Sequence, residues 1–282
     1  MDDVQPNGDS QSEYAICSLV APDGPLEVLD VEPGLIHSLP EELLIAILDV
    51  LHLSEIDAEP DSPKIRLLVP TIACQVSSSW RQLALNHPLW WSYIYIAPPW
   101  KLDAIQAYLN RSGECPLDIW ISVDPNYYRY KDEIGLPSLA DYLHLGPILF
   151  AHLPRCRSLT FHGIFRGVDY LLAYLITPLI GLDMPYLEEL MIDCDFEREH
   201  GDIPKTLFQS APRLIDVRLG GLSAASFRPP FSNIRSLHLS HTTDKHRLTF
   251  SHLKDILVSC EYLSTLAIYN DILIDWNGMD LE

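Results

Sequence analysis

A short apolar pattern recurs five times in the second half of the chain, and it constrains the fold more than any other feature. Each copy has apolar residues at the first, fourth and sixth of six positions, so the last two side chains point to the same side of an extended strand. The copies begin 20 to 31 residues apart, a range typical of repeat architectures. They occupy residues 156–161, 187–192, 214–219, 234–239 and 263–268.

Helical patterns precede the first copy at residues 139–153 and lie between later copies at residues 170–176, 203–208 and 253–258. When strands alternate with such connections, they pair in parallel, and stacking of similar units produces a curved solenoid. The sequence therefore predicts a mixed α/β fold with a parallel, curved sheet.

Two further strands are expected ahead of the repeats, at residues 93–96 and 116–123, where apolar and polar side chains alternate. An amphipathic helix through Leu102, Ile105 and Leu109 separates them. Gly113 is placed as the C-terminal cap of this helix.

The segment before these strands has a helical period. Ser38 and Glu41 have the spacing of a capping box, which marks a helix start. An acidic, turn-rich insert at residues 52–63 should end this helix, and a second element should resume near Lys64. A third helix is expected over about residues 77–86, where His87 and Pro88 stop it. The apolar stripe of the first helix is Leu43, Leu44, Ile47, Leu48 and Leu51, and that of the third is Trp80, Leu83 and Ala84.

These residues resemble the F-box family. The resemblance rests on Leu39-Pro40-Glu41-Glu42-Leu43-Leu44, on Val76 with Trp80-Arg81, and on Pro88-Leu89-Trp90. The acidic insert resembles the variants common in mushroom-type fungi. The five later copies resemble the degenerate leucine-rich repeats of F-box proteins, although the Asn or Cys that follows the last strand leucine in such repeats is mostly missing.

The resemblance implies a substrate-recognition subunit of an SCF-type ubiquitin ligase. The F-box would dock on a Skp-type adaptor, and through it on a cullin-RING ligase, while the repeats bind a protein target. Such a subunit is not itself an enzyme. The residues carried over as adaptor-binding are Leu39, Pro40, Leu43, Leu44, Ile47, Val76 and Trp80. An alternative is that Trp80, Leu48 and Leu83 only pack a small core, or that the stripe packs on the repeats.

Alternation along the repeat strands predicts which side chains face outward on the concave sheet. In solenoids this row is the usual binding surface, although each residue could equally be an ordinary solvated strand residue. The candidate target-binding residues are Ser158, Thr160, His162, Glu189, Met191, Asp193, Asp216, Arg218, Ser236, His238, Ser240, Thr265, Ala267 and Tyr269.

The charge and the residue composition of the chain argue against several classes of binding partner and of active site. A formal net charge of −20, without a run of basic residues, argues against binding to nucleic acid or to an anionic membrane. The six cysteines lack metal-site spacing, so we expect reduced thiols, no metal, no cofactor and a cytoplasmic or nuclear location. The nearest approach to a nucleophile elbow, residues 221–225, lacks the final glycine. Four histidines at 238, 241, 246 and 252 are more simply surface residues than a metal site.

Three segments follow from these patterns. Residues 1–34 are expected to form a disordered tail, residues 35–96 the F-box domain, and residues 97–282 the repeat domain. An alternative from another functional class is a leucine-rich scaffold or binding protein, whose F-box-like helices only cap the solenoid and have no ubiquitin role.

Overall fold

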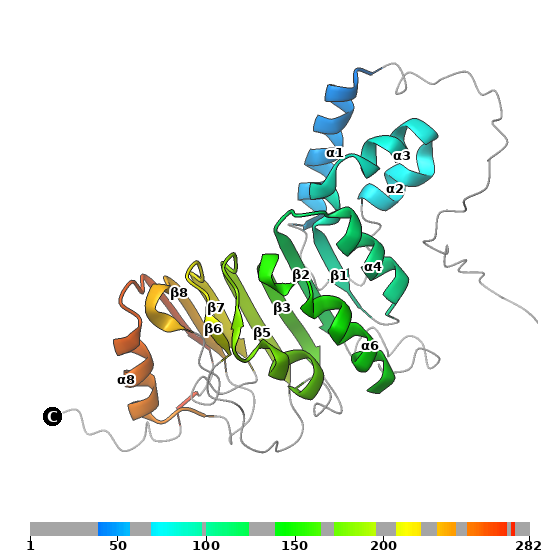
Figure 1. The fold of residues 1–282 in the computed structure, drawn as a ribbon. Helices are drawn as coiled ribbons and strands as arrows, with labels where there is room; N and C mark the ends of the chain where they lie inside the picture. The colour runs from blue at the N-terminus through cyan, green and yellow to red at the C-terminus, as the bar shows by residue number, and fades with distance from the viewer. Residues whose placement is uncertain are drawn as a thin grey trace, which may run out of the picture.

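The computed structural model describes residues 39–56, 69–97, 100–123, 139–164, 172–195, 207–220, 230–240, 247–269 and 272–273. The expected tail at 1–34, the capping residue Ser38, most of the insert and the resumption near Lys64 lie outside these residues. The described part combines a group of short helices at one end with a broad parallel sheet (Figure 1).

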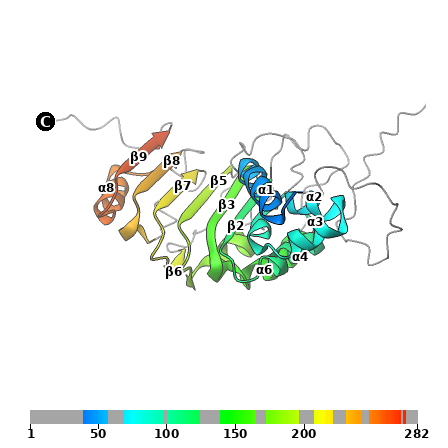
Figure 2. The same cartoon turned by 90° about the horizontal axis from the view of Figure 1, so that it is seen from above.

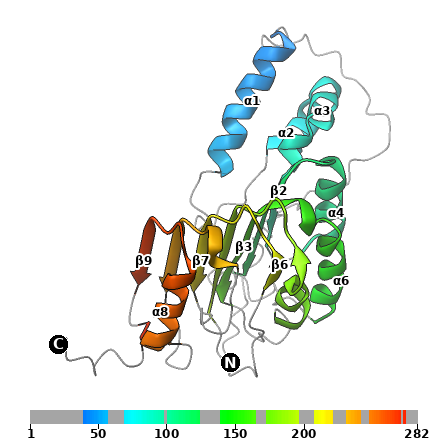
Figure 3. The same cartoon turned by 60° about the vertical axis from the view of Figure 1, so that its left-hand side comes forward.

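The helical end consists of α1 (Glu41–Ile56), α2 (Val69–Val76) and α3 (Ser78–Leu85), followed by the 3-10 helix η2 (Pro88–Trp91). The predicted third helix is confirmed, and the Ser77 hydroxyl caps it by accepting the Trp80 backbone N–H at 3.2 Å. Figure 3 shows α1 projecting beyond the edge of the sheet.

The first helix ends within the predicted insert at 52–63, because α1 continues past His52 and stops at Ile56. His52 is buried, so this turn packs against the chain instead of leaving it. The next turn is fixed by Glu55, whose carboxylate accepts the backbone N–H of Val69 at the start of α2 at 2.9 Å. Glu55 thus joins the end of α1 to the N-terminus of α2, where a carboxylate is favourable.

In the described part of the chain, the main sheet has seven strands, all parallel and in chain order. This confirms the mixed α/β fold with a parallel sheet, to which each of the five apolar copies contributes one strand. The strands are β1 (Tyr93–Ile96), β2 (Leu117–Val123), β3 (Cys156–Ile164), β5 (Glu189–Asp195), β7 (Asp216–Gly220), β8 (Ser236–Ser240) and β9 (Thr265–Tyr269).

The register aligns equivalent positions of the five copies. The fourth positions pair in one line across the sheet, and so do the sixth positions two residues later. Apolar side chains of the same kind therefore stack at the same level in neighbouring strands. The first line is Leu159, Leu190, Val217, Leu237 and Leu266, and the second is Phe161, Ile192, Leu219, Leu239 and Ile268.

The same pattern extends into β1. Trp91, Ile94 and Ile96 have the spacing of a further copy, and Ile94 and Ile96 pair with Ile119 and Ile121 of β2. All five side chains are buried. Trp91 directly follows the Pro88-Leu89-Trp90 segment, so this copy begins immediately after the end of the helical region.

Helices α4 (Leu102–Arg111), α6 (Leu139–Phe150) and α8 (Phe250–Ser259) lie on one side of the sheet (Figure 2). α4 ends as predicted at Gly113, whose φ of 55° is the left-handed conformation of a C-terminal cap. The apolar residues of the strands and the inner sides of these helices form one continuous core.

The helical prediction for residues 203–208 fails at its C-terminal end. Phe208 begins β6 (Phe208–Ser210), which pairs in parallel with β4 (Leu182–Asp183) in a second, two-stranded sheet. Residues 203–206 lie outside the described part of the chain. A short apolar run in a sequence is compatible with either a strand or a helical turn. In this segment the pairing with β4 shows that Phe208 belongs to a strand.

Candidate functional site

The outer side of α1 carries large aliphatic side chains that remain exposed. Leu43 is 54% exposed and Ile47 is 46% exposed. Val50 and Leu51 continue the same stripe at helical spacing and are also exposed. The adjacent side of the helix is buried, at Leu44, Leu48 and His52. Thus α1 is apolar on two sides, and the described residues of the chain cover one of them.

Most of the predicted adaptor-binding residues are accessible. Pro40, at the start of α1, is exposed, and Leu39 beside it is partly exposed. Val76 is exposed at the end of α2. Together with Leu43 and Ile47, these residues give the helical end an apolar surface.

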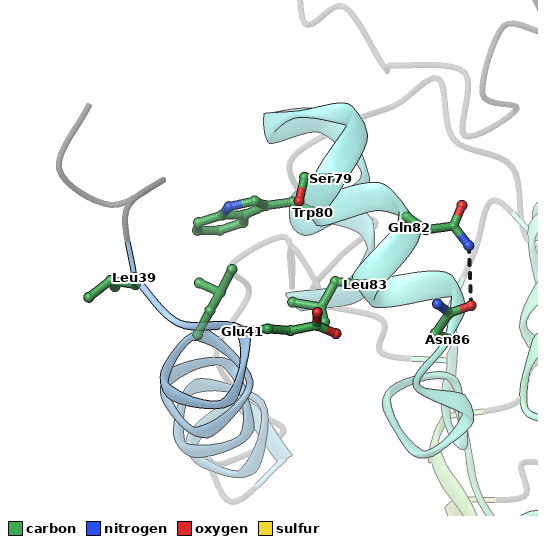
Figure 4. A pocket seen from close by; sticks show the side chains of 8 residues that line it. Leu39, Glu41, Ser79, Trp80, Gln82, Leu83 and Asn86 are labelled. Atoms are coloured by element: carbon green, nitrogen blue, oxygen red, sulfur yellow. Dashed lines mark hydrogen bonds between the residues drawn. The ribbon is translucent and has the colours of Figure 1, made fainter. Parts of the chain in front are cut away.

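Leu44 and Trp80 differ from that expectation, because both are buried in the chain's own core. Both line a cavity of about 360 Å³ between α1 and α3, and Figure 4 shows Trp80 extending from α3 toward α1. Leu83, Glu41 and Gln82 line the same cavity, so its wall combines apolar and polar side chains.

The helical end is joined to the sheet through buried side chains. The indole N–H of Trp91 donates to the Ala84 carbonyl at 2.8 Å, which links η2 to α3. The hydroxyls of Thr71 in α2 and Tyr108 in α4 share a hydrogen bond of 2.7 Å. Burial raises the pKa of Tyr108 to about 12, so this phenol stays neutral at physiological pH. The helices therefore form one body with the first strands.

A second candidate surface is the side of the main sheet opposite α4, α6 and α8, which we call the open face. The register places all the predicted target-binding residues in three rows on this face. The first row contains Ser158, Glu189, Asp216, Ser236 and Thr265. The second contains Thr160, Met191, Arg218, His238 and Ala267. The third contains His162, Asp193, Ser240 and Tyr269, with Gly220 between Asp193 and Ser240.

Thr160 is the exception to the expected exposure. It is buried, because it lies in its row between the large side chains of Trp120 and Met191. The register continues this side of the sheet over β1 and β2, where alternation along the strands predicts the residues that belong to it. They are Tyr93, Tyr95, Asp118, Trp120 and Ser122, of which Tyr93 and Ser122 are buried.

Arginine side chains neutralise two carboxylates of the first row. Arg157 Nε donates to Asp118 Oδ1 at 3.0 Å, and the hydrogen bonds with this carboxylate raise the pKa of Arg157. Arg218 Nε donates to Asp216 Oδ1 at 3.2 Å. Both guanidinium groups are thus directed toward the first row.

The third row has a different arrangement. His162 Nδ1 lies 3.7 Å from Asp193 Oδ2. The Asp193 carboxylate lies over Gly220, where a Cβ atom would overlap with it and would be 2.5 Å from the Ser240 hydroxyl oxygen. A carboxylate and a hydroxyl therefore converge above the glycine.

Other candidate sites have no support in the described residues. Among these residues no group of three or more His, Cys, Asp and Glu side chains could hold a metal ion. His238 stacks on Tyr269 with ring centroids 6.3 Å apart, whereas His241, His246 and the elbow-like residues 221–225 lie outside the described residues.

The chain was compared with models of protein families, with curated proteins and with solved structures, and none of them matches it. Within the described ranges, no helix has the length and apolar character needed to cross a membrane.

Proposed function

We propose that the chain is the substrate-recognition subunit of an SCF-type ubiquitin ligase, with an F-box at residues 35–96 and leucine-rich repeats in the remainder. The exposed aliphatic stripe of α1 carries the proposal. Helices that cover all of their apolar surface have no need of a partner, whereas α1 leaves Leu43, Ile47 and Val50 in solvent.

The position of the stripe also fits this role. It lies at the β1 end of the sheet, so a protein docked there leaves most of the open face accessible to a second protein (Figure 1). The chain would then hold a target close to a ubiquitin-charged enzyme. Its contribution would be proximity, with the chemistry supplied by other subunits.

The alternative is that the helices only cap the sheet. Trp90 and Trp91 are fully buried between these helices and β1, and their apolar core is continuous with that of the repeats. Capping explains the buried side of α1. It does not explain the exposed side, which makes no contribution to covering β1.

Co-purification with a Skp-type adaptor tests the proposal. We expect the full chain to retain the adaptor, and a Leu43→Asp/Ile47→Asp variant to lose it, because two carboxylates would enter an apolar interface. Val258→Asp is the matched control, since Val258 is an exposed aliphatic residue of α8 at the other end of the molecule. Failure of the wild type to bind, or equal binding of the double variant, would favour the capping role.

A further inference from the structure

The Asp193 carboxylate occupies a position that its neighbour Gly220 makes possible. Among the described glycines, Gly113 and Gly181 have positive φ angles, whereas Gly220 does not. The requirement for glycine at position 220 therefore comes from the lack of space for a side chain and not from the backbone conformation. Any Cβ there would overlap with Asp193 Oδ1, and it would also crowd the Ser240 hydroxyl. The absent side chain lets the carboxylate lie along the sheet.

Aromatic rings stand on the other side of Asp193. The His162 imidazole pairs with Asp193 in the register, and its ring centroid is 6.0 Å from that of Trp120. The Trp120 indole Nε1 is buried and makes no hydrogen bond to another described residue. Asp193 thus lies between an aromatic wall and a serine hydroxyl.

The Asp193 carboxylate is accessible for an added charged group. Its side chain is 45% exposed, and the 3.7 Å separation from His162 Nδ1 is longer than a hydrogen bond. The arginines that neutralise carboxylates on the open face, Arg157 and Arg218, are engaged with Asp118 and Asp216 of the first row.

We propose that Asp193, together with its third-row neighbours Gly220, Ser240 and His162 and with Trp120 of the second row beside His162, binds an arginine side chain of the target protein. A guanidinium group can donate two parallel hydrogen bonds to a carboxylate while its plane rests on an aromatic ring. A lysine ammonium has the charge and three N–H donors, but it lacks the planar fork that makes two parallel hydrogen bonds. The net charge of −20 favours the approach of a basic segment. The proposal rests on the open face being the target-binding surface of the proposed function.

A singly charged probe tests the site in the full chain. The probe is an acetylated and amidated tripeptide with one central arginine, and matched tripeptides carry lysine or glutamine at the centre. Binding is followed by NMR, from the indole N–H resonance of Trp120 and the ring resonances of His162. We expect saturable shifts with arginine, weaker binding with lysine and none with glutamine.

Substitutions in the site should weaken arginine binding. Asp193→Asn keeps the shape of the side chain and removes its charge, so we expect at least about tenfold weaker binding. Gly220→Ala should weaken it as well, because the methyl group displaces the carboxylate. Asp216→Asn, on the same face in the first row, is the control and should bind as the wild type does. Equal binding by Asp193→Asn, or equal binding of the glutamine peptide, would overturn the proposal.

The outcome of this experiment is independent of the outcome of the adaptor test. If the adaptor binds but arginine does not, the chain is still a candidate ligase subunit, and the arginine site is wrong. If arginine binds at Asp193 but no adaptor is retained, the site is real, and the ubiquitin role is wrong.

Discussion

The indole Nε1 of Trp90 donates a hydrogen bond to the Asp49 carboxylate at 2.6 Å, across 41 residues of sequence. Asp49 lies in the middle of α1, and Trp90 is buried in η2 beside the first strand. The bond therefore fixes the helix that carries the exposed stripe to the end of the sheet.

Asp49→Ala should lower the free energy of unfolding by about 1–3 kcal/mol, because it leaves the Trp90 indole N–H without its charged acceptor. Asp49→Asn retains an acceptor oxygen and should cost less. Urea denaturation of the three proteins measures the difference. If Ala and Asn are equally harmless, the hydrogen bond does not anchor α1.

Gly113 should tolerate asparagine better than alanine. Its φ of 55° is left-handed, and no atom lies within 4 Å of an added Cβ, so the cost of a side chain comes from the backbone alone. We expect Gly113→Ala to destabilise the protein by about 1 kcal/mol, and Gly113→Asn by less, since asparagine adopts this conformation more readily. Thermal unfolding of the two variants shows which of them is more stable. If packing of the side chain decided their stability, the alanine variant would be the more stable one.

His52 should make stability depend on pH. Burial lowers its pKa from the ordinary value of 6.5, with a smaller opposing effect of Asp49. Near and below that value the unfolded chain binds the proton more readily than the folded chain. The free energy of unfolding should therefore fall as the pH falls through 6.5 toward the folded-state pKa.

His52→Leu removes this titration, so the variant should lose less stability than the wild type between pH 7.5 and pH values below 6.5. Urea unfolding across this range measures both slopes. Identical slopes would contradict the assignment, because the carboxylates that also titrate at low pH are common to both proteins.

The repeated strands of the fold could be predicted from the sequence, because the same spacing of apolar residues predicts two things. It shows which side of each strand is buried, and it shows which residues of neighbouring strands lie side by side. Leu190 and Leu237 illustrate this, since each is the fourth residue of its copy and each is buried at the same level of the sheet. The copy that begins at Trp91 is harder to predict, because the 3-10 helix η2 includes its first residue and β1 includes the other two.

The site could be predicted only in part. Alternation assigned Asp193 and His162 to the open face, but periodicity says nothing about neighbours in other strands. The role of Gly220 depends on Asp193, which lies 27 residues earlier, and no local pattern connects them. Likewise, the burial of Leu44 and Trp80 depends on how α1 and α3 meet, which spacing along either helix does not determine.

The final prediction concerns two leucines that are equivalent in sequence and different in burial. Leu237 and Leu266 occupy the fourth position of adjacent copies and pair with each other in the register. Leu237 is completely buried, whereas Leu266 is 41% exposed because no further strand follows β9 in the main sheet of the described residues.

Leu237→Ala should cost about 2–5 kcal/mol, since it removes buried methyl groups and leaves a cavity that a β-sheet core fills poorly. Leu266→Ala should cost less than half as much, because much of that side chain is already in water and its site can relax. Guanidinium denaturation of both variants gives the two values under the same conditions. Equal losses in the free energy of unfolding would contradict this prediction. They would mean that Leu266 is as buried in solution as Leu237, so that another part of the protein or a second molecule covers β9.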